Sequence, residues 1–241
     1  MRLDKKKMIA AAIVACTTLF IAIGIHEKKD TRKQLKFGAT YMTMNNPYFV
    51  NMDENIEESV QAKGDILITR DPLQDQKKQN EQIKDMINEG IDVLFLQPVD
   101  RNKVRPALEL CKKKHIPVVV IDSEVSDTEA VVSTIVSDNY DAGVQCAKDM
   151  MKKKTSANII IVNQKALNSI NERVKGFRDT IKGHPQYKIV EEKESAAEFE
   201  IAMKVMEKII YEKKNYDVVM GGNDPIALGC RCRYGNNSAY Q

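Results

Sequence analysis

Amide, carboxylate, arginine and aromatic side chains gather at the ends of short apolar runs in this chain. They occur in Asn45-Asn46-Pro47-Tyr48-Phe49, Arg70-Asp71-Pro72, Gln97-Pro98-Val99-Asp100, Asp122-Ser123, Asn163-Gln164 and Asn223-Asp224-Pro225, and Arg173 follows soon after one of these ends. The set suits a neutral polyol, because each hydroxyl both donates and accepts and bidentate Asp, Asn and Arg satisfy it in a fixed orientation. Aromatic faces would cover the apolar C–H side of a sugar ring.

The same set argues against catalysis. The sequence holds no nucleophile–base pair, no paired catalytic carboxylates and no cluster with metal-ligand spacing. Cys230 and Cys232 form a C-x-C without a matching His or Cys pair nearby, so a zinc site is not expected. We therefore expect a binding protein rather than an enzyme, with no metal and no cofactor.

The elements that position these residues alternate between strand and helix. The predicted strands are short apolar runs that cover 35–42, 65–70, 91–97, 116–122, 131–137, 158–163, 188–192 and 217–222. Helical periodicity predicts helices over 48–62, 76–89, 102–114, 171–182 and 198–213. Several strands are apolar on both faces, which indicates an α/β fold whose parallel sheets are covered by helices on each side.

After residues 131–139 the alternation starts afresh, which predicts two doubly wound (Rossmann-like) lobes joined by a hinge at 137–138. Ligands of such folds bind beyond the carboxyl ends of the strands, and a cleft between two domains is a favoured site. We therefore expect the polar strand ends to form an interdomain ligand cleft.

Composition places the chain among ordinary globular proteins, with 43% apolar and 29% charged residues and a net charge of +3 over 241 residues. The lysine runs at 112–114 and 152–154 fall in the predicted last turns of helices, where cations suit the helix dipole. No aromatic residue lies between these lysines, so no nucleic-acid partner is expected. Cys111 and Cys146 are predicted to be buried free thiols on helix faces.

The first thirty residues predict export. A basic segment at 1–7 precedes an uncharged apolar run at 8–25, which is typical of an export signal or an apolar anchor helix. Three outcomes are open: lipidation at Cys16, cleavage near Ala22 or Gly24, or retention as a membrane anchor, of which we favour retention. The protein would then act at the outer face of the cytoplasmic membrane, or in the periplasm if cleaved.

From about Leu35 to Gly229 the chain resembles the periplasmic sugar-binding proteins of ABC importers, of the ribose-binding type. The resemblance rests on MNNPYF (44–49), LQPVD (96–100), VVIDSE (119–124), STIVSDN (133–139), SINERVKGF (169–177) and GGNDPIALG (221–229), in this order. It implies the type I periplasmic binding protein fold and a monosaccharide ligand. The partners implied are the transmembrane permease subunits of an ABC transporter, with the membrane reached through the N-terminal segment.

The resemblance also implies site residues. They are Asn46 to hydrogen-bond the sugar, Tyr48 and Phe49 to sandwich it, Gln97 and Asp122 to bind hydroxyls, Arg173 to donate to two hydroxyls, Phe199 to stack from the opposite side and Asn223 to close the set. Two departures bear on the ligand. Ser123 stands where the ribose binders have Arg, and Tyr48 replaces a Phe, which adds a phenol.

Simpler roles are open for several of these residues. Phe49 could be plain core, Asp122 a turn residue, and Arg173 a partner of Glu172 or Glu194. Asn45 is expected to be the N-cap or a turn residue rather than a ligand group, because a helix starts just after it.

Four segments are expected: a signal peptide or anchor (1–30), an N-terminal sugar-binding lobe (31–137), an incomplete C-terminal lobe (138–229) and an aberrant tail (230–241). The tail has no helical period, and a one-base frame change would account for it as out-of-frame sequence on a truncated product. Because the family takes further ligand contacts from its C-terminal segment, weak or absent sugar binding is expected. The alternative to transport is a membrane-anchored sugar sensor that feeds a chemoreceptor or a histidine kinase.

Overall fold

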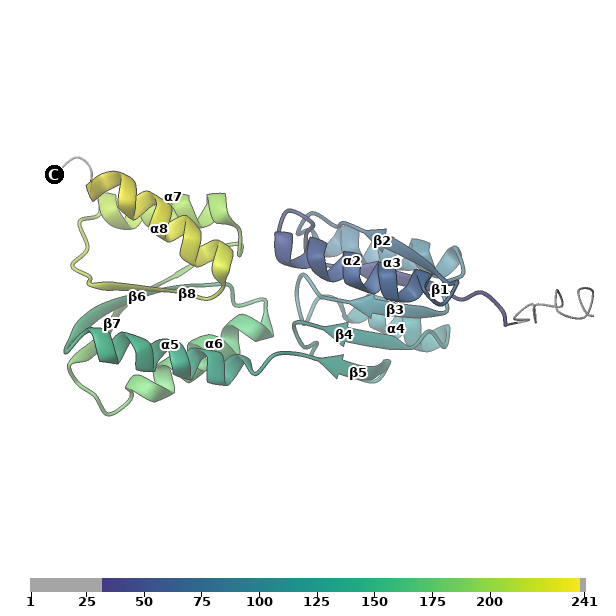
Figure 1. Ribbon diagram of the computed structural model, residues 1–241, viewed down its shortest axis with the longest axis horizontal. Helices are drawn as coiled ribbons and strands as arrows, with labels where there is room; N and C mark the ends of the chain where they lie inside the picture. The colour runs from purple at the N-terminus through teal and green to yellow at the C-terminus, as the bar shows by residue number, and fades with distance from the viewer. Residues whose placement is uncertain (1–31, 239–241) are drawn as a thin grey trace, which may run out of the picture. The chain divides into compact units, whose positions relative to one another are not determined.

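The computed structural model describes residues 32–238, and for 233–238 it describes the backbone alone. The first part of the chain holds β1 (Lys36–Thr40), α2 (Pro47–Gln61), β2 (Ile66–Arg70), α3 (Gln76–Asn88), β3 (Val93–Leu96), α4 (Arg105–Lys113), β4 (Val118–Ile121) and β5 (Val131–Ile135). The second part holds α5 (Asn139–Lys153), β6 (Ala157–Asn163), α6 (Asn168–Ile181), β7 (Tyr187–Glu194), α7 (Phe199–Tyr211), β8 (Val218–Gly221) and α8 (Asp224–Ser238). All eight predicted strands are confirmed, mostly with shorter bounds (Figure 1).

The strands form two parallel sheets. The first has the order β2-β1-β3-β4-β5 and the second the order β7-β6-β8. We call β1–β5 with α2–α4 the first lobe, and β6–β8 with α5–α8 the second lobe. Within the described residues the chain passes from one sheet to the other once, between β5 and α5, as expected for the predicted crossover. The predicted α/β class and doubly wound lobes are confirmed.

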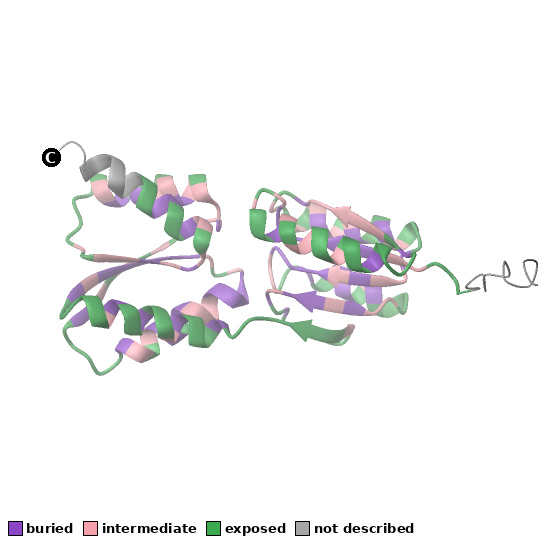
Figure 2. Ribbon diagram, viewed as in Figure 1, coloured by how far each residue is buried: buried purple, intermediate pink, exposed green. Residues whose placement is uncertain are grey.

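The first lobe is built around the buried strands β3 and β4. Leu94, Leu96, Val118 and Val120 are fully buried and share a core with α3 and α4, which pack against each other. Such strands, apolar on both faces, are those that helices cover on each side. Figure 2 shows β5 as mostly exposed, in contrast to β3 and β4.

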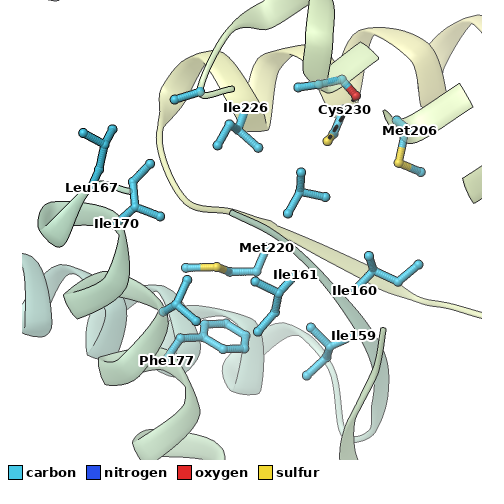
Figure 3. Packing of buried hydrophobic residues seen from close by; sticks show 14 of the residues in the cluster. Ile159, Ile160, Ile161, Leu167, Ile170, Phe177, Met206, Met220, Ile226 and Cys230 are labelled. Atoms are coloured by element: carbon cyan, nitrogen blue, oxygen red, sulfur yellow. Dashed lines mark hydrogen bonds between the residues drawn. The ribbon is translucent and has the colours of Figure 1, made fainter. Parts of the chain in front are cut away.

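The second lobe is layered. In Figure 1, α5 and α6 lie on one side of β6 and β8, and α7 and α8 lie on the other. Successive residues of a strand face opposite sides, so Ile159 and Ile161 of β6 face one helix pair while Ile160 faces the other. Figure 3 shows Phe177 of α6 beside Ile161 and Met220 in this core. Strand β6 at the centre of the sheet is therefore buried on both faces.

Short-range signals set several helix ends as predicted. Gly90 follows α3 with φ +82°, a left-handed conformation that suits glycine at a helix C-terminus. The lysine runs at 112–114 and 152–154 do end α4 and α5, where their charges face the negative end of the helix dipole.

One expectation is wrong. Cys146 is exposed: it lies at the edge of the buried face of α5, which is formed by Asn139, Gly143, Ala147 and Met150. The backbone of residues 230–238 is helical, because α8 runs from Asp224 to Ser238. Ile226 and Cys230, four residues apart, are both buried on its inner face.

Among residues 32–238 no helix is both long and apolar enough to cross a membrane. The apolar run at 8–25, with Cys16, lies outside the described residues.

Candidate functional site

The two sheets reverse their strand order at defined points. In the first lobe the chain leaves β1 toward β2 and returns to β3 on the other side of β1. In the second lobe it leaves β6 toward β7 and returns to β8. Loops diverge at such switch points, so ligands of open α/β sheets bind there, beyond the carboxyl ends of the strands.

A cavity lies at these carboxyl ends and is lined from both lobes. Its lining residues are Met42, Asn46, Tyr48, Phe49, Asp122, Ser137, Leu167, Ser169, Ile170, Arg173, Asn223, Asp224 and Pro225. Its volume is about 130 Å³, below the roughly 300–1,000 Å³ typical of drug-sized ligand pockets. The cavity therefore suits a small molecule. Six of the eight sequence-predicted residues are brought together here.

Asn46 enters the cavity as the N-cap of α2. Its Oδ1 accepts from the backbone N–H of Tyr48 at 3.0 Å, and Pro47 occupies the first helical turn. The amide Nδ2 of Asn46 keeps its two donors for another partner. The N-cap is Asn46. Asn45 is the turn residue that the sequence also allowed: it is exposed and donates its backbone N–H to the hydroxyl of Thr43.

Asp122 directly follows β4 and has φ +63°, a left-handed conformation that turns the chain at the strand end. Burial raises the pKa of the Asp122 carboxyl, although the nearby Arg173 charge and the polar groups of Tyr48 and Gln97 act to lower it. Burial, followed by the Asp122 charge, likewise raises the pKa of the Tyr48 phenol. The Tyr48 phenol and the Asp122 carboxyl thus act on each other at the wall of the cavity.

Arg173 reaches the cavity from the second turn of α6. Its Nε donates to Oδ1 of Asn139 at 2.9 Å, and one terminal nitrogen donates to the backbone carbonyl of Gly222 at 3.3 Å. Neither Glu172 nor Glu194, the partners that the sequence offered, is a hydrogen-bond or ion-pair partner of its guanidinium. The charge of Arg173 instead acts on Asp122 and Tyr48 across the site.

Aromatic side chains form one wall. Phe49 is 3% exposed and packs on Tyr41 with ring centroids 5.9 Å apart, while Tyr48 meets it edge to face at 5.2 Å and is 51% exposed. Tyr41 is itself fixed, because its hydroxyl donates to Asp53 at 3.0 Å. Phe49 is therefore both a core residue and part of the cavity wall, so the two roles weighed from the sequence coexist.

Gln97 and Phe199 do not line this cavity. Gln97 is fully buried behind it, where its Oε1 accepts from the backbone N–H of Met42 at 2.6 Å, a residue that does line the cavity. Phe199 is the first residue of α7 and half-buried. Gln97 thus supports the loop after β1, while its buried amide nitrogen has no hydrogen-bond partner among the described residues.

Sequence reasoning missed the serine hydroxyls of the site. Ser137 lies in the segment between the lobes and Ser169 near the start of α6, and both line the cavity. Ser123, expected to leave a donor missing, is fully buried, and its hydroxyl accepts from the backbone N–H of Ser169 at 3.3 Å. The sequence signal that could have identified Ser169 is its position shortly after the loop that follows β6.

The described residues contain no group of three or more His, Cys, Asp or Glu side chains that could hold a metal ion. The polar groups of the cavity are amides, hydroxyls, the carboxylates of Asp122 and the exposed Asp224, and the Arg173 guanidinium, whose charge opposes that of Asp122. The arrangement can hold a small, neutral, hydroxyl-rich molecule by hydrogen bonds without a net ionic interaction.

Two parallel-sheet lobes with a cavity at their facing strand ends define the periplasmic binding protein class. The chain belongs to the family of the periplasmic binding protein domain, which matches residues 37–231.

Individual relatives agree. The chain is 26% identical over 200 residues to the ribose import binding protein of Bacillus subtilis (strain 168), which covers 82% of this chain and 65% of that protein. It is 25% identical over 215 residues to the ribose import binding protein of Haemophilus influenzae, covering 88% and 73%. The chain thus spans about two thirds of the length of these curated relatives.

Solved structures give the same fold. An ABC transporter solute-binding protein from Mycobacterium smegmatis, with bound glycerol, superposes with a TM-score of 0.80 at 27% identity and covers 86% of this chain and 72% of that one. The Caulobacter myo-inositol binding protein, bound to myo-inositol, gives a TM-score of 0.78 at 21% identity, covering 86% and 71%. The second likeness supports the fold alone.

Proposed function

We propose that this chain is an extracytoplasmic solute-binding protein that holds one monosaccharide between its lobes and delivers it to the membrane subunits of an ABC importer. The observation that carries the proposal is the composition of the cavity. Donor amides of Asn46 and Asn223, the Asp122–Arg173 charge combination and the Tyr48 and Phe49 rings converge on one small space.

Each part suits a sugar. A hydroxyl needs both a donor and an acceptor, which the amides, Asp122 and Arg173 supply in fixed directions. The opposite charges of Asp122 and Arg173 balance, so a neutral ligand meets no unbalanced buried charge. An analogue that lacks a matching hydroxyl would leave buried polar groups unpaired, and that cost gives selectivity.

Delivery to a transporter follows from the relatives, whose names identify ribose, apiose and galactofuranose binding or import proteins. Closure of the lobes about the segment at 137–138 on the bound sugar would give the permease a distinct liganded form to recognise. We favour this role over the sensor alternative because those curated relatives are import proteins.

The proposal is tested on the purified full chain. A thermal-shift screen against D-ribose, D-apiose, D-galactose, D-allose and myo-inositol, followed by isothermal titration calorimetry, should find at least one ligand with saturable binding, which is weak rather than absent. Variant Arg173→Ala should bind that ligand at least ten times more weakly, because a charge-assisted donor is lost. Absence of saturable binding to any of these compounds would overturn the proposal.

The place of action is tested separately. With residues 1–30 acting as an export signal or anchor, the lobes lie outside the cytoplasmic membrane. Cells are treated so that protease can pass the layers outside the cytoplasmic membrane while that membrane stays intact. Added protease should then digest the lobes while a cytoplasmic marker protein survives. Digestion only after the cells are lysed would contradict export.

A further inference from the structure

Helices α5 and α6 touch backbone to backbone at two glycines. A Cβ atom built on Gly143 would lie 1.9 Å from the carbonyl oxygen of Arg173, and one built on Gly176 would lie 2.0 Å from the carbonyl oxygen of Tyr140. Both separations are far inside van der Waals contact, so only glycine permits this approach. The crossing therefore fixes how the first turn of α5 lies beside α6.

That crossing sets Asn139 next to Arg173. Asn139 precedes Gly143 by one turn of α5, and Arg173 precedes Gly176 by almost one turn of α6. Asn139 is 7% exposed, and its Oδ1 accepts from the Nε of Arg173 at 2.9 Å. Its Nδ2 donates to the carbonyl of Ser137 at 3.1 Å, in the segment that joins the lobes.

The guanidinium is thus held at two of its edges from two different elements. Asn139 takes the Nε donor, and the carbonyl of Gly222, after β8, takes a donor from one terminal nitrogen at 3.3 Å. Two anchors fix both the position and the rotation of a planar group. The remaining donors of Arg173, which lines the cavity, are the ones available to a ligand.

We infer that Asn139 is a positioning residue. It does not line the cavity, but it orients the Arg173 guanidinium, and its second hydrogen bond couples that orientation to the backbone of the segment between the lobes. The inference rests on the proposed function, because it gives Arg173 a ligand-binding role. It makes the segment at Ser137 part of the binding machinery, so that a change in its course on closure alters the direction in which Arg173 donates.

The first test needs no ligand. In ¹⁵N NMR spectra of the full chain, the Nε–H of Arg173 should exchange with water at least about ten times faster in Asn139→Ala than in the wild type, because its acceptor is lost. Asn139→Asp keeps an acceptor and should keep the protection. The control Asn171→Ala removes a comparable hydrogen bond, from Asn171 Nδ2 to the carbonyl of Lys165, without touching Arg173.

The second test uses D-ribose binding by calorimetry. Asn139→Ala should weaken binding about tenfold, Asn139→Asp by less than about threefold, and Asn171→Ala not measurably. In an Arg173→Lys background, which has no Nε, Asn139→Ala should have less than about a twofold further effect.

The outcomes separate the two ideas. Unchanged Nε–H protection in Asn139→Ala, or an equal loss of affinity in the Ala and Asp variants, overturns the positioning role. Loss of protection in Asn139→Ala, with protection retained in Asn139→Asp, supports it even if the wild type binds no sugar, in which case the proposed function fails alone.

Discussion

Asn46 and Asn223 occupy equivalent places in the two lobes. The Oδ1 of Asn46 accepts from the N–H of Tyr48 at 3.0 Å, and the Oδ1 of Asn223 accepts from the N–H of Ile226 at 3.0 Å. Each residue thereby caps a helix that begins at a cavity wall, and each keeps its Nδ2 donors for the cavity. Asparagine is suited to this double task, because one end of its amide accepts and the other donates.

This arrangement predicts that capping and binding can be separated. Asp caps helices as well as Asn does, so Asn46→Asp should change the free energy of unfolding by no more than about 0.5 kcal/mol. It replaces the donor by a second acceptor, so monosaccharide affinity should fall at least about tenfold. Chemical denaturation and calorimetry give the two numbers, and the exposed Asn45→Asp is the matched control. Retained affinity in Asn46→Asp would show that the amide donor is not used.

The Tyr48 phenol is predicted to control the ionisation of Asp122. The nearby hydroxyl of Tyr48 lowers the pKa of that carboxyl, so Tyr48→Phe should raise the pKa further above its ordinary value. Because Tyr48 is 51% exposed, the free energy of unfolding should change by no more than about 0.5 kcal/mol. A ¹³C NMR titration of the Asp122 carboxyl measures the effect. The control is Tyr211→Phe, whose ring is 87% exposed; an unmoved pKa in Tyr48→Phe would refute the contact.

Asp122 is predicted to reduce stability as the pH rises. Its pKa is higher in the folded chain than the ordinary value because of burial, so the native state binds its proton more tightly than the unfolded state does. Stability from this group is therefore fully present below the ordinary carboxyl pKa and is lost as the pH rises through the raised pKa. In Asp122→Asn this loss is absent.

The measurement is urea denaturation of both proteins between pH 3 and pH 7.5. The stability of Asp122→Asn relative to the wild type should rise through the acid range and then level off, while ligand affinity at neutral pH falls at least about tenfold. Relative stability that declines with rising pH would mean that the Arg173 attraction outweighs burial.

The fold was largely predictable from the sequence because it depends on local patterns. Apolar β-branched runs such as 116–122 can be buried only as covered strands, and Gly90 marks the end of a helix. The site was predictable where a residue directly follows a strand, as Asp122 does. The position of Asp122 at the cavity then results from the topology of the sheet rather than from long-range packing.

The rest depends on contacts that no local pattern records. Glu172 is next to Arg173 in the sequence, yet the hydrogen-bond partner of Arg173 is Asn139 on another helix. The close contact of α5 and α6 at Gly143 and Gly176 brings these two residues together. Gln97 follows a strand as Asp122 does, but its side chain is taken up by the backbone of Met42. Cys146 lies beside the buried stripe of α5 on a helical wheel, so the sequence alone does not show that it is exposed.

The close contact of α5 and α6 at Gly143 predicts that alanine at this position destabilises the protein, although alanine has the higher helix propensity. Alanine in a helix interior is ordinarily about 0.5–1 kcal/mol more favourable than glycine. At position 143, however, the new Cβ would lie 1.9 Å from the carbonyl oxygen of Arg173, so α5 and α6 must separate. Gly143→Ala should therefore lower the free energy of unfolding, by about 1–3 kcal/mol.

The neighbouring position supplies the control. Ala142 is exposed on α5, and Ala142→Gly should cost only the propensity difference of about 1 kcal/mol. Separation of the helices also removes the Asn139 acceptor from Arg173, so Gly143→Ala should speed exchange of the Arg173 Nε–H in NMR spectra of the folded variant, whereas Ala142→Gly should not. A Gly143→Ala variant more stable than the wild type would show that the helices can part without loss, and the close crossing would then not determine where Arg173 lies.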